Sequence, residues 1–331
     1  MIIASPGSGM SIFRDRIRIL DVQRNLARAL LDRGEDLLIL EPPNLPQDWK
    51  TGLPRKIFRT FDTGQVWLRD LAPVVGGQVC AFADGYPRNP TSGSRKRSVS
   101  SIAQGCKTQF LDFLNSQGAV CETFSSLIVD AGHVLYNYGS PGNRIALVSH
   151  RVARLNPGVS FLHERLRTLL GVDRLIFVPD PGEDEGRLDG TMCFLEPNVL
   201  MIQNAGPQGR CLPAARSRWD RISAYLSRLL PDVQQFIFNW PAGEGAFGLY
   251  ANCIVTDQTV YVPHYEMPGD FLILERMQEH TGKELVAIDV WPLARLGRMA
   301  WQPPAHWASL IYGSGPPLSD QVDLTRKNSA E

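Results

Sequence analysis

The chain has 331 residues, of which 44% are hydrophobic, and its 34 basic and 34 acidic side chains give a formal net charge of zero. This balance speaks against a general nucleic-acid or membrane-surface partner, since such proteins usually carry a basic excess. A chain of this length can bury a large core, either as one large domain or as two ordinary ones.

The cysteines and the N-terminus bear on cellular context. The six cysteines form no CxxC pair, so the sequence offers no zinc ribbon or thioredoxin-like motif. Their apolar surroundings predict reduced, buried thiols and a cytoplasmic location. We expect no signal peptide, and no stretch of ~18 apolar residues predicts a membrane span. The histidines lack metal-ligand spacing, so we expect neither a metal nor a cofactor.

Hydrophobic periodicity predicts five helices, each followed after a short turn by an apolar strand. The expected helices cover 15–33, 101–117, 160–170, 215–230 and 269–281. The strands that follow begin near positions 36, 119, 174, 233 and 284. Further strands are expected at 79–82, 127–135, 144–149, 191–195 and 199–202, with a hairpin over 250–262. Residues 84–100, with the basic run Arg95-Lys96-Arg97, are expected to form a solvated loop.

This repetition predicts the fold class. Recurring β-β-α-β units favour an α/β protein with radial repetition, a five-bladed α/β propeller with pseudo-fivefold symmetry. We expect a single domain over 1–314 and a polar tail over 315–331. A doubly wound sheet is the alternative, but it would show a glycine-rich turn after the first strand, and Leu40-Glu41-Pro42-Pro43 offers none.

Four polar positions stand at strand ends, which converge near the axis of a radial fold. They are Arg69-Asp70, Asp130 with His133, the acidic run 183–190 that includes Asp189, and Asn252. An Arg-Asp pair in an apolar run is costly to bury without partners, so Asp70 is either part of a structural ion pair or a receptor for a planar cation. His133 is either a satisfied core residue or an acid/base group.

These segments resemble motifs of the agmatine deiminase and bacterial peptidylarginine deiminase family. Segment 67–73 (WLRDLAP), which includes Trp67, resembles W-x-R-D-x-G-P, and segment 186–190 (GRLDG) resembles G-H-x-D-G. Segments 130–132 and 250–270 resemble the family's acidic-Gly-Gly strand and its Y-x-N-F…V-x-P…D segment. The order agrees over about residues 1–305. The resemblance implies the five-bladed propeller of the guanidine-modifying enzymes, with Asp70 and Asp189 as the carboxylates that hold a guanidinium.

Two departures set this chain apart from the family it resembles. The family uses a Cys nucleophile and a His acid/base, but Arg187 stands at the position of the His. The Cys position falls at Met299 or Ala300, and no Cys follows Cys253. Neither Arg, Met nor Ala can serve as nucleophile or as proton donor to the leaving amine. Arg187, with its permanent charge, could instead pair with Asp70, Asp189 or an anionic ligand.

Three hypotheses follow from these residues. The first is a divergent member that binds a small polar, amino-acid-like ligand or a partner protein through Trp67, Arg69, Asp130, Arg187, Asn252, Met299 and Ala300. The second is an enzyme, a hydrolase or transferase of a biosynthetic pathway, that uses Asp70, Asp189 and His133 for acid/base chemistry on a substrate without a guanidine group. The third is a true guanidine deiminase or amidinotransferase that uses Cys193. A homodimer is compatible with the sequence.

Overall fold

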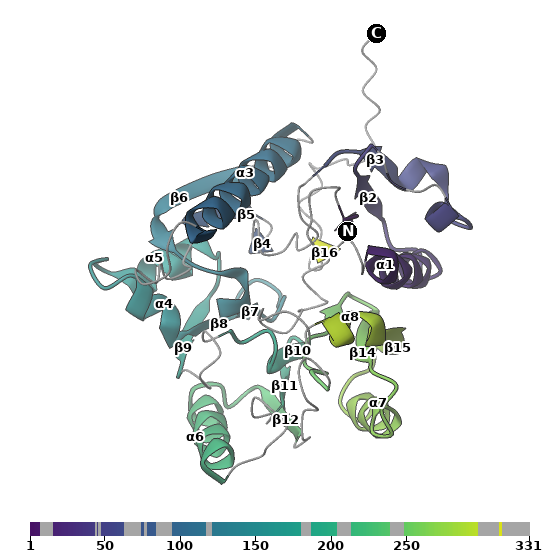
Figure 1. Ribbon diagram of the computed structural model, residues 1–331. Coiled ribbons are helices and arrows are strands. Elements are labelled where there is room, and N and C mark those ends of the chain that lie inside the picture. The colour runs from purple at the N-terminus through teal and green to yellow at the C-terminus, as the bar shows by residue number, and fades with distance from the viewer. Residues whose placement is uncertain are drawn as a thin grey trace.

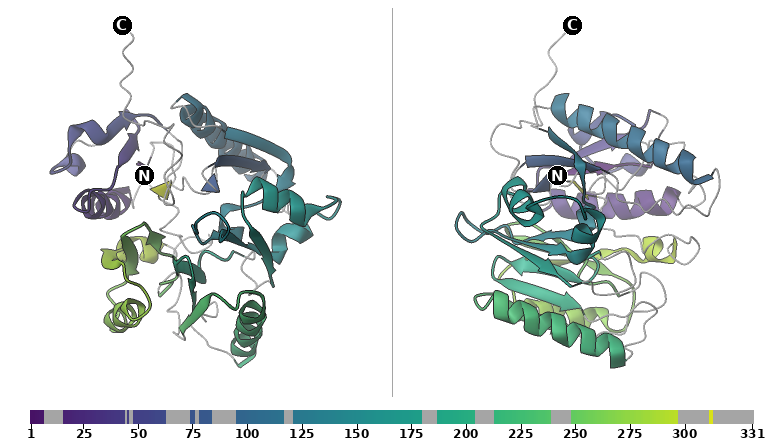
Figure 2. Two further views of the ribbon diagram at one scale, coloured as in Figure 1. Left: turned by 180° about the vertical axis from the view of Figure 1, so that it is seen from behind. Right: turned by 90° about the vertical axis from the view of Figure 1, so that its left-hand side faces the viewer.

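The computed structural model describes residues 1–6, 16–43, 45, 48–62, 74–75, 78–83, 95–116, 121–179, 187–203, 213–238, 248–296 and 311–312. The described strands form five separate sheets, one of four strands and four of three. Figures 1 and 2 show these sheets following one another around the molecule in chain order, with the helices toward the outside. The chain is therefore a mixed α/β protein built from small sheets.

Four of the sheets repeat one connection. In each, the first strand pairs antiparallel with the middle strand, and the third pairs parallel with it. A helical crossover joins the two parallel strands, because their ends are too far apart for a tight turn. The first of these units contains β4 (Val74–Val75), β5 (Gln78–Ala83), α3 (Arg95–Ser116) and β6 (Cys121–Ile128), and the second contains β7 (Val134–Tyr136), β8 (Ile145–Ser149), α4 (His150–Leu155), α5 (Leu162–Leu169) and β9 (Arg174–Val178). The third contains β10 (Met192–Glu196), β11 (Val199–Gln203), α6 (Pro213–Leu229) and β12 (Gln234–Phe238). The fourth contains β13 (Ile254–Val255), β14 (Thr259–His264), α7 (Asp270–Gln278) and β15 (Glu284–Asp289).

The remaining sheet joins the two ends of the described chain. The strand β1 (Ile2–Ala4) pairs antiparallel with β16 (Ile311–Tyr312) and, after helix α1 (Arg16–Leu31), parallel with β2 (Leu38–Glu41). Two short 3-10 turns, η2 (Asp48–Lys50) and η3 (Arg55–Ile57), then lead to the edge strand β3 (Phe58–Thr60). In the other four units, the antiparallel strand comes directly before the middle strand in the chain. Here β16 takes that position next to β1, although about 300 residues separate the two strands in the sequence.

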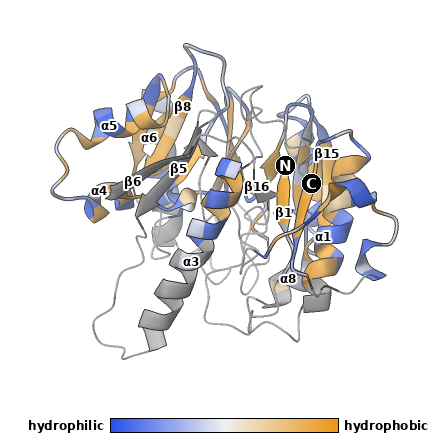
Figure 3. Cartoon of the chain, turned by 90° about the horizontal axis from the view of Figure 1, so that it is seen from above, coloured by the Kyte–Doolittle hydropathy of each residue, from blue (hydrophilic) through white to orange (hydrophobic). Residues whose placement is uncertain are grey.

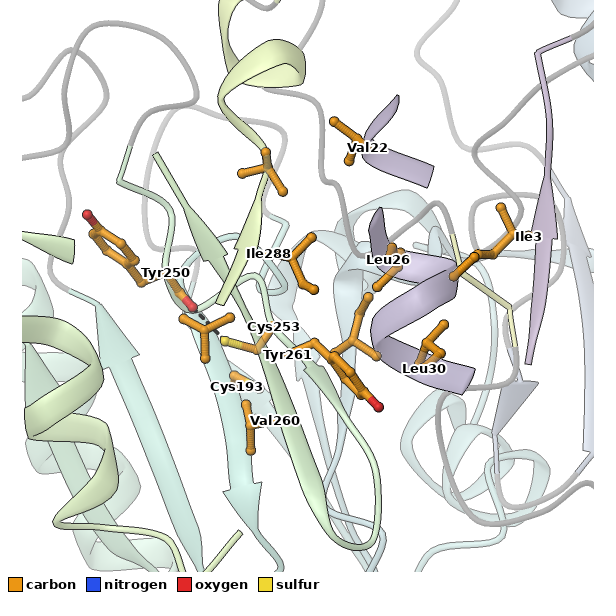
Figure 4. Packing of buried hydrophobic residues seen from close by; sticks show 14 of the residues in the cluster. Ile3, Val22, Leu26, Leu30, Cys193, Tyr250, Cys253, Val260, Tyr261 and Ile288 are labelled. Carbon is orange, nitrogen blue, oxygen red and sulfur yellow. Dashed lines mark hydrogen bonds between the residues drawn. The ribbon is translucent and has the colours of Figure 1, made fainter. Parts of the chain in front are cut away.

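A large apolar cluster packs the N-terminal sheet against the last two sheets. Leu26 and Leu30 of α1 are fully buried against Ile3, and Tyr261 and Ile288 of the last sheet belong to the same cluster (Figure 4). In Figure 3, β1 and β15 are mostly hydrophobic, whereas α1 carries both hydrophobic and hydrophilic residues. The apolar side of an amphipathic helix therefore covers this cluster.

Most predicted elements are present. The strands expected after the third, fourth and fifth helices begin at Arg174, Gln234 and Glu284, and the mixed α/β class is confirmed. The five-bladed closure and the domain limits stay predictions. None of the described helices has the length and hydropathy needed to cross a lipid bilayer.

Three local predictions were wrong. The basic run Arg95–Arg97 begins helix α3 instead of lying in a loop. The strands expected at 119–124 and 127–135 are a single strand, β6, followed by the 3-10 turn η4 (Ala131–His133) and β7. His133 therefore lies in a turn, because the Asp130 carboxylate caps that turn at the Gly132 amide. Helices α4 and α8 (Trp291–Leu296) and strands β1 and β16 were not predicted.

Asn137 provides a test of how neighbouring units are joined. Its Oδ1 accepts from the Ile145 amide at 2.7 Å, and its Nδ2 donates to the carbonyls of Asn143 and Pro197 at 2.9 and 2.8 Å. Pro197 belongs to the next unit. We predict that Asn137→Ala lowers the free energy of unfolding by about 2–3 kcal/mol, because buried backbone groups lose their partners. Urea denaturation measures this, with the exposed Asn143→Ala as control; equal losses in both variants would contradict it.

Candidate functional site

The candidate site begins with the turn between β6 and β7. Asp130 precedes η4, and its Oδ1 accepts a hydrogen bond from the Gly132 amide at 2.8 Å. An aspartate at the start of a turn commonly satisfies an amide in this way. The Gly132 carbonyl in turn accepts from the Leu188 amide at 2.6 Å. This contact places the segment before β10 directly against the turn.

Arg187 and Asp189 form the centre of the site. Arg187 Nε and Nη2 donate to Asp189 Oδ1 and Oδ2 at 3.2 and 2.9 Å, which is a two-point guanidinium–carboxylate pairing. Arg187 Nη1 lies 3.0 Å from Asp130 Oδ1. The Arg187 and Asp189 side chains are 8% and 4% exposed. One guanidinium therefore bridges two carboxylates inside the protein, and direct pairing of this kind is what such buried charges require.

Gly132 leaves the room that the guanidinium fills. A Cβ atom at this position would lie 2.3 Å from Arg187 Nε and 2.5 Å from Cζ. These distances are far inside van der Waals contact, so the backbone of the turn lies against the flat guanidinium group. Any side chain at this position would displace the Arg187 guanidinium, so a glycine fits here because of close approach.

Two amide side chains connect the unit of Asp189 with the segment before β13. Asn252 Nδ2 donates to the Asp189 carbonyl at 2.8 Å. Gln203, at the end of β11, accepts from the Ala251 amide at 3.0 Å and donates to the Gly248 carbonyl. Gln203 was not among the predicted site residues. Its signal in the sequence is a polar residue at the end of an apolar strand, and the structure shows that its side chain is fully buried.

The described part of this cluster is charged. Among the described residues, Asp130, Asp189 and Arg187 bring two carboxylates and one guanidinium together in a largely buried place. The anionic ligand considered from the sequence stays a prediction. No group of three or more His, Cys, Asp or Glu side chains suited to a metal ion occurs in the described part of the chain.

The predicted site residues divide into two sets. Asp130, Arg187, Asp189 and Asn252 come together, and the buried His133 lies in the same turn as Gly132. The other predicted residues lie outside the described residues. They are Trp67, Arg69, Asp70, Met299 and Ala300.

Asp270, singled out by the resemblance, belongs to a second buried polar cluster. Its Oδ2 accepts from the amides of Tyr265 and Met267, both at 2.9 Å, and lies 3.2 Å from His264 Nε2. Its Oδ1 accepts from the Tyr250 hydroxyl. Burial and the neighbouring carboxylate raise the pKa of Tyr250 well above its usual range. These contacts fix the turn before α7, which indicates a structural role.

Cys193 and Cys253 lie next to each other in the apolar cluster (Figure 4). Cys253 Sγ donates to the Tyr250 carbonyl at 2.7 Å. Burial, together with the neighbouring Cys193, raises the pKa of the Cys253 thiol well above its ordinary value. A thiol that stays protonated is a poor nucleophile, so the surroundings of this pair indicate a packing role.

With this geometry in hand, comparison with solved structures defines the class of fold. No protein-family model matches the sequence, and no curated protein matches it. The fold is that of the agmatine deiminases and related guanidine-modifying enzymes.

Three similar structures illustrate this fold. The C. jejuni agmatine deiminase has a TM-score of 0.70 and 13% identity, with 93% of this chain and 91% of that chain covered. A putative peptidyl-arginine deiminase has a TM-score of 0.67 and 16% identity, with 89% and 91% covered. The N-terminal domain of the cyanobacterial arginine dihydrolase ArgZ has a TM-score of 0.58 and 13% identity, with 96% and 98% covered.

Gly132→Ala tests the close approach to Arg187. We predict a loss of about 1–3 kcal/mol in the free energy of unfolding, because the added methyl group overlaps the guanidinium. Gly105→Ala in α3, where a Cβ meets nothing within 4 Å, is the control and should be neutral or stabilising. In an Arg187→Ala background the cost of Gly132→Ala should nearly vanish. An equal cost in both backgrounds would show that Arg187 is not the group in contact.

The Cys253 thiol gives a second prediction. Its pKa is higher in the folded state than in the unfolded chain. The protonated thiol therefore makes its full contribution to the free energy of unfolding below the ordinary thiol pKa of about 8.5, and this contribution is lost as the pH rises above that value. We predict that iodoacetamide at pH 8 leaves Cys253 unmodified in the native protein and alkylates it in denaturant. Peptide mass spectrometry reads this out. Rapid alkylation of the native protein would contradict it.

Proposed function

We propose that this chain is a non-hydrolytic member of the guanidine-modifying superfamily. In it, Arg187 pairs with the carboxylates that would otherwise bind a substrate guanidinium. The observation that carries the proposal is the two-point pairing of Arg187 with Asp189, extended to Asp130 by Nη1. A guanidinium bound in this manner has the geometry expected of a bound substrate. In this protein the guanidinium is part of the chain itself.

The sequence supports the loss of hydrolysis. By its resemblance to the family motif, Arg187 replaces the His that would transfer a proton, and Met299 or Ala300 replaces the nucleophilic Cys. A deiminase needs both a thiolate to attack the guanidinium carbon and an acid to release the amine. Cys193 is poorly suited to replace the nucleophile, because its own side chain is buried in the apolar cluster.

We further propose that the five sheets are the blades of a five-bladed α/β propeller. The repeated strand order and the pairing of β1 with β16 support this closure. Polar residues at the strand ends would then line a central pocket. In this arrangement the pocket holds a small polar or amino-acid-like ligand, or a partner, beside the Arg187 ion pairs and without breaking them.

An enzyme with altered acid/base chemistry is the second candidate, and the contacts of Asp189 favour it less. Both of its carboxylate oxygens accept from Arg187. Hydrogen bonds from a permanent cation stabilise the ionised form of a carboxylate and make it a poor proton donor. His133 would then have to supply the acid/base function.

The proposal is tested with agmatine and with putrescine, which has the same carbon chain but no guanidine group. We predict that the wild-type protein releases no ammonia from agmatine or arginine and gains no thermal stability from agmatine. Arg187→Ala empties the space between Asp130 and Asp189, so millimolar agmatine, but not putrescine, should raise its Tm. Arg187→Lys keeps the charge without the planar group and serves as control.

Two results would contradict the proposal. One is ammonia release by the purified wild-type protein. The other is stabilisation of wild type and Arg187→Ala by agmatine to the same extent, which would mean that Arg187 does not occupy the guanidinium position.

A further inference from the structure

Two buried thiols meet where the third and fourth units pack together. Cys193 lies in β10, and Cys253 lies in the segment directly before β13. Both belong to the large apolar cluster, in which their side chains are neighbours (Figure 4). The two residues are 9% and 6% exposed, and both thiols are free. The function proposed above gives neither of them a role.

The two sulfur atoms are in direct contact. The Cys253 Sγ donates to the Tyr250 carbonyl at 2.7 Å, and the Cys253 thiol also shares a hydrogen bond with the Cys193 thiol. A disulfide bond requires the two sulfurs to approach to about 2.05 Å. Thiols that already bond to each other need only a short further approach to reach this separation.

The segment that carries Cys253 is fixed on the third unit by the residues next to it. Asn252 Nδ2 donates to the Asp189 carbonyl at 2.8 Å, and the Ala251 amide donates to Gln203 Oε1 at 3.0 Å. Cys193 follows Asp189 in the same unit by four residues. The thiols are therefore held together by the backbone on both sides of the contact, so the contact belongs to the packing of the two units.

Burial determines when this pair can react. A thiolate, and not a thiol, attacks a disulfide bond. In the folded protein, burial and the hydrogen bond with Cys193 raise the pKa of the Cys253 thiol, so this thiol stays protonated. Reaction therefore requires folding or a local opening in which water reaches the two thiols. After the segment closes again, the product is as well shielded from reductants as the thiols are from oxidants.

We propose that Cys193 and Cys253 form a reversible disulfide bond, which joins β10 to the segment before β13 when the chain folds or opens in the presence of glutathione disulfide. One cysteine thiolate attacks a sulfur of glutathione disulfide and releases the first glutathione thiolate. The second cysteine thiolate attacks the protein sulfur of this mixed disulfide and releases the second. Two protein thiols are thereby oxidised, and one glutathione disulfide is reduced to two glutathione molecules. The proposal is independent of Arg187 and of the function proposed above.

The linkage has a measurable effect on stability. It would close a loop of about 60 residues, because Cys193 and Cys253 are that far apart in the sequence. Such a loop restricts the unfolded chain and leaves the native contacts in place. We expect the oxidised protein to have a Tm about 3–6 °C above that of the reduced protein.

The test unfolds the full chain in urea and refolds it in a buffer of reduced and oxidised glutathione. Peptide mass spectrometry without reduction should find the Cys193–Cys253 linkage in the refolded protein, together with the higher Tm. Refolding with dithiothreitol should remove both. Cys106→Ala keeps both thiols of the pair and should behave like the wild type, whereas Cys193→Ala should show neither the linkage nor the change in Tm.

Two results overturn the proposal. One is that both thiols remain free, or bond to other cysteines, in refolded protein whose circular dichroism matches that of the untreated protein. The other is that the linkage forms but leaves the Tm unchanged or lowers it, which would mean that the folded state does not accommodate the bond. Native protein incubated with glutathione disulfide in urea below the unfolding transition gives the same comparison without complete unfolding, and absence of the linkage there has the same meaning.

Discussion

The arrangement of this protein depends on one buried guanidinium. Arg187 lies between Asp189 and Asp130, and it connects the segment before β10 to the turn after β6. Removing one partner of such a buried ion pair commonly costs about 3–5 kcal/mol, because the remaining charge is left without compensation. In the function proposed above, the same contact takes the place that a substrate guanidinium would otherwise occupy. Structural stability and the proposed loss of hydrolysis therefore have a common physical cause.

The surroundings of Arg187 are adapted to it from three sides. Gly132 has no side chain where the flat guanidinium needs space, and its carbonyl accepts from the Leu188 amide. Asn252 holds the Asp189 backbone from the following unit. These contacts come from separate sheets, so the site forms only when neighbouring units pack together. A group held in this way is preorganised and has little freedom to leave.

Sequence patterns predict this protein unevenly, for physical reasons. The strands beginning at Arg174 and Gln234 are continuous apolar runs after amphipathic helices, so periodicity locates them well. The pairing of β1 with β16 involves two very short strands at opposite ends of the chain, which no local pattern reveals. Within the site, the sequence leaves Asp70, Asp189 and an anionic ligand open as partners of Arg187, and the structure shows the pairing with Asp189. The contribution of Asp130 depends on a tertiary contact that the sequence does not reveal. Gln203 was missed because it bonds backbone groups of the segment before β13, which is distant in the sequence.

The state of the Arg187 side chain in solution is the most direct measure of this account. Nitrogen-15 NMR of the guanidinium group reports on hydrogen exchange and on rotation about the Nε–Cζ and Cζ–Nη bonds. We expect the Arg187 Nε–H to be protected from exchange and the Nη groups to rotate slowly, unlike those of the exposed Arg165. Asp189→Asn should abolish this protection. Rapid exchange and free rotation at Arg187 in the wild-type protein would contradict the claim that its guanidinium occupies the site.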